Sequence, residues 1–540
     1  MRVLFSFIVM LLISSCSTTE VVDLIVRNAN IHTMDDENPN ATYLVVNNEK
    51  IVAVGSDEND LEAYEAKEII DADQKTLIPG IIDAHCHFYG LGLNQQRVDL
   101  VGTLSYDEII SKVQAFEQEN PDMQFILGRG WDQNDWEVKD FPTKEKLDAL
   151  FPDKAVVLER VDGHAYLVNQ KALDLAKITA KTPSNGGAIL KKNGELTGVL
   201  VDNPMQRVDR IIPELSRTEQ IQALIKAEDI CFSYGLTTVN DAGLSRSTIE
   251  LIDSLQQSGD LKIRVYAMVS NTPRDVNHFL DKGILKTDRL NVRSVKVYAD
   301  GALGSRGAAL KEEYSDQHNH FGAMVTPVAA IEQLAQRIAD SEYQMNTHAI
   351  GDSANAVVLR AYQKVLKSDT DRRWKIEHAQ VIDLDDIENF GTQILPSVQP
   401  THATSDMYWA EDRLGSDRIE GAYAFKTLLE KSGVLPLGTD FPVEQVSPFL
   451  TFYAAVTRQD TAGYPDGGFM ESEKLSPEQA LKGMTLWPAY SNFEEEEKGS
   501  LEPGKWADFV ILSKDILKAA SDELPNIQAE KTFVAGVQVH

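Results

Sequence analysis

The chain has 540 residues, of which 43% are hydrophobic and 25% are charged, and its net charge at pH 7 is −31. This composition is that of an ordinary globular protein with a large core, and the length allows more than one domain. The strong negative charge argues against binding to nucleic acid, because a phosphate backbone would be repelled.

The first twenty residues have the pattern of an export signal. The apolar run 3–13 is too short for a usual membrane span and long enough for the hydrophobic part of a signal peptide. It ends in Ile-Ser-Ser-Cys, which resembles a bacterial lipobox, so we expect a lipoprotein signal peptide over 1–15, lipid on the thiol of Cys16 and a tether over 16–20. The protein would then be membrane-anchored, facing the periplasm or the cell surface. An ordinary signal peptide with an incidental cysteine is the alternative.

Short β-rich segments mark both ends of the remaining chain. Residues 21–78 carry β-branched runs bounded by Asn, Gly or Asp, and the same sequence pattern occurs again near the C-terminus. We therefore expect one β-sandwich domain built from residues 21–79 and 496–540.

The middle of the chain alternates short apolar runs with amphipathic segments, which is typical of βαβ units and a parallel sheet. The sequence predicts an α/β fold with a (β/α)8 TIM-type barrel over residues 80–495. Residues from about 100 to 220 do not fit the count of eight strands, so we interpret them as an insertion after barrel strand 1, over the face that carries barrel active sites. The opening strand lies in 77–88, and the others lie at 236–243, 262–269, 293–301, 344–352, 375–380, 393–400 and 434–440.

Two histidines one residue apart end the opening strand. Because side chains alternate along a strand, His85 and His87 point to one side and Cys86 points to the other. Two neutral imidazoles at a strand end make half of a metal site. One buried and one exposed structural histidine is the alternative.

Four further residues lie at strand ends or inside the predicted barrel. His348, His378 and Asp440 end their strands, whereas the alternation in RSVKVYADG points Lys296 into the barrel. A buried lysine is costly unless it is neutralised or paired. The amine either adds carbon dioxide to give a carbamate, which can bridge two cations, or lies in an ordinary buried ion pair.

These residues lie in motifs that resemble the amidohydrolase superfamily, and within it the YtcJ-like, amidohydrolase-3 group that includes N-substituted formamide deformylases. The resemblance covers nearly all of the chain after the signal. The resemblance identifies the superfamily specifically, but it gives little indication of the substrate. The motifs are PGIIDAHCH, ERVDGHAYLVN, VKVYADGALGSR, THAIGD, IEHAQ, LGTDFPV and KGSLEPGKWADFVIL.

The resemblance implies a metal-dependent amidohydrolase with two divalent ions, with zinc favoured over iron, manganese or nickel. In such an enzyme a metal-activated hydroxide attacks the carbonyl of a formamide, an N-acyl compound or a cyclic amide. Asp440 would then be catalytic and carry a proton from the water to the leaving nitrogen. The implied ligands are His85, His87 and Asp440 for the first metal, His348 and His378 for the second, and carboxylated Lys296 for both.

Weaker candidates surround this set. His164, in the insertion, either hydrogen-bonds the substrate carbonyl as a catalytic residue or holds the insertion to the barrel. Trp131 either lines the pocket with Asp132 or is a core tryptophan beside a capping aspartate. Arg306 is expected to pair with a substrate carboxylate or with Asp300. The candidate substrate-binding residues are Arg160, Asp162, Asp300, Arg306, Trp131 and His402.

Two other functions stay open from the sequence. One is a mononuclear deaminase on the same fold, in which a bridging lysine has no purpose. The other is a lipoprotein that captures a solute and catalyses nothing, although every expected ligand position is kept. As partners we expect a small-molecule amide substrate, no nucleic acid, and a membrane through the N-terminal lipid alone. A homodimer is left open.

Overall fold

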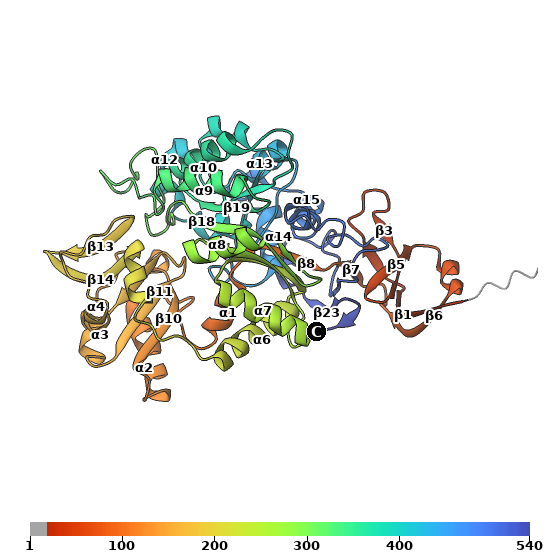
Figure 1. Ribbon diagram of the computed structural model, residues 1–540, viewed down its shortest axis with the longest axis horizontal. Helices are drawn as coiled ribbons and strands as arrows, with labels where there is room; N and C mark the ends of the chain where they lie inside the picture. The colour runs from red at the N-terminus through yellow and green to blue at the C-terminus, as the bar shows by residue number, and fades with distance from the viewer. Residues whose placement is uncertain (1–18) are drawn as a thin grey trace, which may run out of the picture.

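The computed structural model describes residues 19–540 (Figure 1). The predicted signal peptide and the lipidation of Cys16 lie outside the described residues. Within this range, no helix has the length and apolar character needed to cross a membrane. The insertion sheet, the central barrel and the N-terminal strands follow one another along the long axis in Figure 1.

A curled parallel sheet forms the centre of the fold, in the order β21-β20-β19-β18-β16-β15-β8, with the short β17 paired antiparallel to β18. The α/β class and the parallel barrel sheet predicted from the sequence are therefore confirmed. The strands are β8 (Ile81–Cys86), β15 (Leu236–Leu244), β16 (Arg264–Ser270), β17 (Leu285–Lys286), β18 (Leu290–Tyr298), β19 (Gln344–Ala349), β20 (Trp374–His378) and β21 (Ile394–Ser397).

The eighth predicted strand, 434–440, is irregular in the structure. Pro436 interrupts it, because proline has no N–H to donate to a strand ladder. The segment still joins the two edges of the sheet. The amide of Val398, just after β21, donates to the carbonyl of Pro436 at 3.0 Å, and the amide of Ala84 in β8 donates to the carbonyl of Leu437 at 3.2 Å. A TIM-type barrel therefore closes through seven regular strands and one irregular segment.

Helices cover the outside of the barrel, and local signals fix where they begin. Ser216 and Glu219 form a capping box at the start of α6, and Thr272 caps α8, whose first residue is Pro273. The helices outside the insertion are α1 (Phe88–Asn94), α6 (Arg217–Ser233), α7 (Arg246–Ser258), α8 (Pro273–Lys282), α9 (Val328–Ala339), α10 (Asp352–Val365), α11 (Pro400–Asp406), α12 (Ala410–Arg418), α13 (Phe425–Ser432), α14 (Pro448–Thr457), α15 (Pro477–Gly483) and α16 (Leu486–Ser491).

The insertion builds its own six-stranded sheet, in the order β13-β14-β12-β11-β10-β9. Helix α2 packs on it through Ile109, Ile110 and Val113, which share one face of the helix. Its strands and helices are β9 (Val98–Asp99), α2 (Tyr106–Glu119), β10 (Phe125–Trp131), α3 (Glu145–Leu150), β11 (Ala155–Arg160), β12 (Ala165–Val168), α4 (Gln170–Leu175), β13 (Gly187–Lys192), β14 (Glu195–Asp202) and α5 (Gln206–Asp209).

The two ends of the chain meet in one sheet. Its order is β24-β23-β22-β7-β2-β3, so β7, which leads into the barrel, pairs antiparallel with β22 near the C-terminus. A second sheet, β5-β4-β1-β6, comes from the N-terminal segment alone. The strands are β1 (Glu20–Arg27), β2 (Asn30–His32), β3 (Asn40–Ala41), β4 (Tyr43–Asn47), β5 (Lys50–Gly55), β6 (Tyr64–Asp71), β7 (Thr76–Pro79), β22 (Phe509–Leu512), β23 (Ala529–Val534) and β24 (Val537–Gln538).

A buried ion pair joins the barrel to this shared sheet. Arg264 at the start of β16 donates from Nε to Oδ2 of Asp508 at 2.6 Å and from Nη2 to Oδ1 at 3.0 Å. Oδ1 also accepts from the amide of Ala535 at 2.8 Å, and the carbonyl of Asp508 accepts from the amide of Gly80 at 2.8 Å. The carboxylate of Asp508 therefore joins the start of β16 to the residue after β23, and its backbone carbonyl also holds Gly80 before β8.

We expect Asp508→Ala to lower the free energy of unfolding by about 3–5 kcal/mol, because Arg264 would stay buried without its partner. Denaturant unfolding followed by circular dichroism measures this loss. The control is Asp23→Ala, which removes an exposed pair with Lys67 and should cost less than about 1 kcal/mol. Equal losses in the two variants would contradict the role of the buried pair.

Candidate metal centre

A cavity of about 1010 Å³ lies at the carboxyl ends of the barrel strands. Strand ends form one wall, where His87, Lys296 and Asp440 lie. The insertion forms the opposite wall, with Arg129 and His164 among its lining residues. The insertion therefore covers the barrel face on which active sites of this architecture are built.

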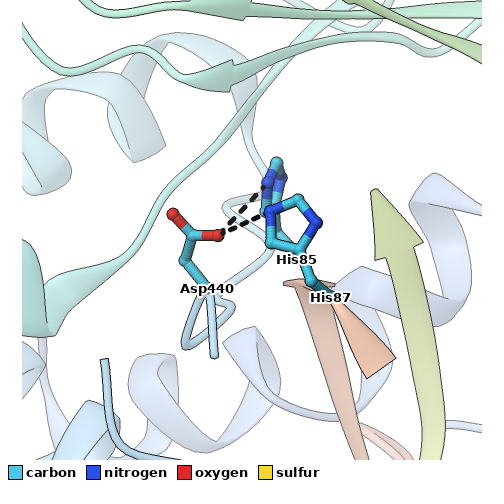
Figure 2. Close-up of side chains that lie close together, drawn as sticks. All are labelled: His85, His87 and Asp440. Atoms are coloured by element: carbon cyan, nitrogen blue, oxygen red, sulfur yellow. Dashed lines mark ion pairs between the residues drawn. The ribbon is translucent and has the colours of Figure 1, made fainter. Parts of the chain in front are cut away.

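The Asp440 carboxylate lies between two groups of histidines. Its Oδ1 is 3.7 Å from Nε2 of His85 and 3.3 Å from Nε2 of His87. Figure 2 draws both ion pairs as dashed lines. Its Oδ2 is 3.2 Å from Nε2 of His402 and 4.0 Å from Nδ1 of His378. Each group of three residues, the carboxylate included, brings its ligand atoms within 4.8 Å of one another.

This donor set fits a divalent cation. Oδ1 of Asp440 is buried and has no hydrogen-bond partner among the described residues, although buried acceptors are rarely left unpaired. Imidazole nitrogens together with a carboxylate are the ligands that zinc takes in catalytic sites. Burial, followed by the nearby rings of His348 and His85, holds the pKa of His378 well below its usual value. The neutral imidazole that a metal requires is therefore favoured there.

In three of these rings, Nδ1 contacts a buried or half-buried side chain. Metal-ligating histidines are typically oriented in this way, through a carboxylate, carbonyl or water on the other ring nitrogen. The contacts are His85 Nδ1 to Glu377 Oε2 at 2.6 Å, His378 Nδ1 to Gln399 Oε1 at 2.7 Å, and His402 Nδ1 to Glu444 Oε1 at 3.1 Å.

Unusual backbone angles turn two of the site residues inward. Along β20 the alternation places Lys375 and Glu377 inside the barrel, and the next residue would face the helices. A positive φ of 72° at His378 breaks the alternation and brings its ring against that of His85, with 4.8 Å between centroids. Asp440 has a φ of 61°. Such strained positions cluster at functional sites.

The first barrel strand holds the segment that carries Asp440. Asp83 of β8 accepts a hydrogen bond from the hydroxyl of Thr439 at 2.7 Å, and the amide of Asp440 donates to the carbonyl of His85 at 2.8 Å. Burial raises the pKa of Asp83 to about 7. The histidines of β8 and Asp440 are thus fixed relative to one another by direct contacts.

Lys296 of β18 points into the barrel, and its Nζ lies 3.2 Å from Nε2 of His85. The side chain is almost inaccessible, and burial lowers its pKa to about 8. None of the ion pairs between described residues includes Lys296, so the structure does not show the ordinary buried ion pair that the sequence left open.

His164 reaches the barrel site from the insertion. Its Nδ1 lies 2.6 Å from Oδ1 of Asp202, and its ring centroid lies 5.1 Å from that of His348. Burial lowers the pKa of His164, but the hydrogen bond and the charge of Asp202 outweigh burial and hold the pKa above its usual value. His348 lines the cavity but is outside the two groups around Asp440, with its Nε2 3.4 Å from the carbonyl of Gly301.

Arg160 and Asp162 line the cavity, but their charges are already paired. Arg160 donates to Oδ2 of Asp162 at 2.5 Å, to Oε1 of Gln133 at 2.9 Å and to Asp132. The guanidinium is 1% exposed. It therefore joins the ends of β10 and β11 and offers no free cation to a substrate.

Three other predicted substrate contacts lie outside the cavity lining. Trp131 is buried in the insertion core and donates its indole N–H to the carbonyl of Leu158 at 2.9 Å. Asp300 accepts three backbone amides at 2.8–3.0 Å, and Arg306 pairs with Asp316 at 2.9 Å instead of with Asp300. The sequence made these residues candidates, but it did not give the direction of their side chains.

The residues that hold the histidines were not among those predicted from the sequence. Glu377 and Gln399 each lie within three positions of a candidate histidine, and Glu444 follows LGTDFPV closely, so their proximity in the chain was a usable signal. Asp202, which contacts His164 across the insertion sheet, had no such signal. Asp241 lines the cavity, accepts from the amide of Tyr89 at 2.9 Å and has its pKa raised by burial to about 6.

A TIM-type barrel with imidazoles arranged about one carboxylate at its C-terminal face defines a metal-dependent hydrolase. The sequence profile of the Amidohydrolase family matches residues 68–540. The chain belongs to the Amidohydrolase family, and the predicted resemblance is confirmed.

The similarity of the chain to known relatives and to a solved structure extends over nearly its whole length. The chain is 32% identical to YtcJ of Bacillus subtilis (strain 168), over 94% of this chain and 98% of the relative, and 32% identical to the protein LONG AFTER FAR-RED 3 of Arabidopsis thaliana, over 96% and 92%. It is 25% identical to an N-substituted formamide deformylase of Arthrobacter pascens, over 96% and 98%. The crystal structure of an uncharacterized metal-dependent hydrolase from Pyrococcus horikoshii OT3 superposes with a TM-score of 0.75 at 28% identity, over 92% and 99%.

We expect Glu377→Gln to weaken divalent-cation binding by about 10- to 100-fold, because a neutral amide holds the imidazole of His85 less firmly than a carboxylate does. Titration of the metal-stripped protein with Zn²⁺, followed by calorimetry, measures the affinity. Asp386→Asn changes a surface carboxylate that pairs with Lys311 and serves as the control. Identical affinities for parent and Glu377→Gln would show that Glu377 does not position the ring.

Proposed function

We propose that this protein hydrolyses a C–N bond in a small amide-like substrate, such as a formamide, an N-acyl compound or a cyclic amide. The observation that carries the proposal is the Asp440 carboxylate between two groups of imidazoles, with an unpaired Oδ1 among the described residues. The similarity to an N-substituted formamide deformylase supports an amide as substrate. Bound divalent cations would lower the pKa of a coordinated water and polarise a carbonyl oxygen.

Asp440 is the residue that moves the proton. Hydrolysis forms a bond from the water oxygen to the carbonyl carbon and breaks the bond from that carbon to nitrogen. The carboxylate accepts the proton that the water releases and delivers it to the departing nitrogen, which leaves as an amine. Although burial opposes ionisation, the hydrogen bond from His402 and the nearby ring of His87 outweigh it and hold the pKa of Asp440 well below its usual value. The carboxylate is therefore ready to act as the base.

His164 is the residue that we assign to the substrate carbonyl. Asp202 engages its Nδ1, which leaves Nε2 available, and the ring lies on the cavity wall beside His348. The raised pKa favours the donating form of the imidazole. A donor aimed at the position where negative charge develops on oxygen stabilises the transition state.

Lys296 supports the finer proposal of two cations, with zinc the favoured metal. Its amine can add to carbon dioxide and release a proton, which gives a carbamate with two oxygen ligands. The lowered pKa increases the fraction of neutral amine that this addition requires, and the short contact with His85 would put the product beside the histidine groups. A solute-binding protein would have no use for this modification or for the strained Asp440.

The substrate class is tested by a panel of N-formyl, N-acetyl and cyclic amides offered to zinc-reconstituted protein, with metal content measured in the same sample. Release of amine from at least one member is the expected result. A metal-loaded protein that turns over no member but binds one of them tightly would support the solute-binding alternative. A protein that releases ammonia from a nucleobase or another amidine and cleaves no amide would support the deaminase.

Asp440→Asn is expected to lower turnover by about 10²- to 10⁴-fold per bound cation, because the amide cannot accept and return the proton. Initial rates of amine release, divided by measured metal content, give the comparison. Asp386→Asn, on the surface, is the control and should keep the parent rate. Parent-like turnover in Asp440→Asn would exclude the carboxylate as the proton carrier.

The carbamate has its own test. Protein loaded with Zn²⁺ and ¹³C-bicarbonate should give a carbamate signal in carbon-13 NMR that Lys296→Met removes. Lys375→Met is the matched control, since Lys375 is equally buried, has its pKa lowered by burial to about 8, and hydrogen-bonds Asn492 away from the cavity lining. A signal that persists in Lys296→Met, or that vanishes in Lys375→Met instead, contradicts the assignment.

A further inference from the structure

We propose that Arg97 binds a carboxylate group of the substrate, so that N-acyl amino acids are preferred over neutral amides. The preference rests on the proposed hydrolysis of an amide and narrows the class of amide that the site accepts. Arg97 lines the cavity, and it was not among the residues predicted from the sequence.

Arg97 lies where the barrel meets the insertion. It follows α1 and directly precedes β9, the edge strand of the insertion sheet. Helix α1 begins after His87 and has 7 residues, so it is about 10 Å long. The charge of Arg97 opposes the rise in pKa that burial causes at Tyr89, in the first turn of this helix. Arg97 therefore follows the strand of His87 by one short helix, and both residues line the same cavity.

Two guanidinium groups share the carboxylate of Glu159. Its Oε1 accepts a hydrogen bond from Nη1 of Arg129 at 2.5 Å, whereas its Oε2 lies 3.4 Å from Nη1 of Arg97. Arg129 and Glu159 are direct neighbours in the register of β10 and β11. Nη2 of Arg129 also donates to the carbonyl of Val161 at 3.0 Å. Arg129 is therefore the main partner of Glu159, and the charge of Arg97 is left largely uncompensated.

Arg97 has hydrogen-bond donors to spare. A guanidinium carries five N–H groups. Among the described residues, the side chain of Arg97 makes one hydrogen bond, the long one to Glu159. Asp99 is the neighbour of Arg129 on the other side, but its Oδ1 accepts from the amide of Val101 at 3.0 Å, and no ion pair in the described part of the chain joins it to either arginine. The side chain of Arg97 is 25% exposed, so a ligand can reach it.

Arg129 and Glu159 lie beside the residue that we assign to the substrate carbonyl. Gly163 directly precedes His164, and a Cβ at this position would lie 3.5 Å from Nη2 of Arg129 and 3.5 Å from Oε1 of Glu159. The ring of His164 in turn lies 5.1 Å from that of His348. In an N-acyl amino acid, a single carbon separates the amide nitrogen from the carboxylate. Cations this close to the carbonyl-binding residue suit that short spacing.

A free guanidinium distinguishes an acid from its neutral carboxamide. Its planar fork can donate two parallel hydrogen bonds to a carboxylate, whereas a carboxamide offers a single uncharged acceptor. Arg160 cannot fill this role, because two carboxylates and Gln133 already occupy its guanidinium. Since a hydrogen bond between charged groups is stronger than one to a neutral group, Arg97 should favour the acid by about 10- to 100-fold.

The test compares molecules that differ only in this charge. N-formyl and N-acetyl derivatives of glycine, L-methionine and D-methionine are offered as free acids and as carboxamides to zinc-reconstituted parent, Arg97→Gln and Arg207→Gln, and release of formate or acetate gives kcat/KM. Arg207, exposed on α5 of the insertion and outside the cavity lining, is the matched control. We expect Arg97→Gln to lower kcat/KM for the acids by about 10- to 100-fold, chiefly through KM, with the carboxamides unchanged.

The outcomes separate the carboxylate site from the function on which it rests. A parent that cleaves other amides but not these acids, or an Arg97→Gln variant that keeps the parent's preference for acid, overturns only the carboxylate site. Calorimetry with the same molecules decides if the parent cleaves no amide at all. Tighter binding of the acids that Arg97→Gln abolishes would then support the site and overturn the hydrolase, and the lack of such a difference would overturn both.

Discussion

The contact between the first barrel strand and the segment that carries Asp440 is the constraint on which the site depends. The amide of Asp440 donates to the carbonyl of His85, and Asp83 holds Thr439 from the same strand. These bonds close the barrel where a regular eighth strand is missing, and they fix the carboxylate against the histidines of β8. Fold closure and site assembly are therefore the same event, and a change that loosens one must loosen the other.

The shielding of the cavity comes from a different part of the chain. The insertion carries its own sheet and core, so it can hold His164 and the Arg160 pairs rigidly over the barrel mouth. The hydrogen bond from Nδ1 of His164 to Asp202 crosses from the loop before β12 to the end of β14, and it fixes the ring from inside the insertion. The histidine groups around Asp440 belong to the barrel, while the opposite wall of the cavity belongs to the insertion.

Much of this arrangement could be predicted from periodicity and spacing, and the failures have physical causes. Strand alternation gave the inward direction of Lys296, and the barrel followed from counting βα units. Alternation could not give His378, because its positive φ places two successive residues of β20 inside. The sequence also could not give the side-chain directions of Trp131 and Arg306, because these depend on packing in the insertion core and on the charge of Asp316. The residues that hold the histidines come from other strands or from across a loop, which a linear pattern shows weakly.

The pairing of β7 with β22 has a consequence for how the protein is made. The ribosome releases β7 and the histidine strand β8 early, but their partners, the segment 434–440 and β22, emerge near the end of synthesis. The barrel therefore cannot close until synthesis is nearly complete. Until then, the edge of β8 that contacts the segment 434–440 has no partner. Translation products that end before Asp440 lack the carboxylate that both histidine groups share.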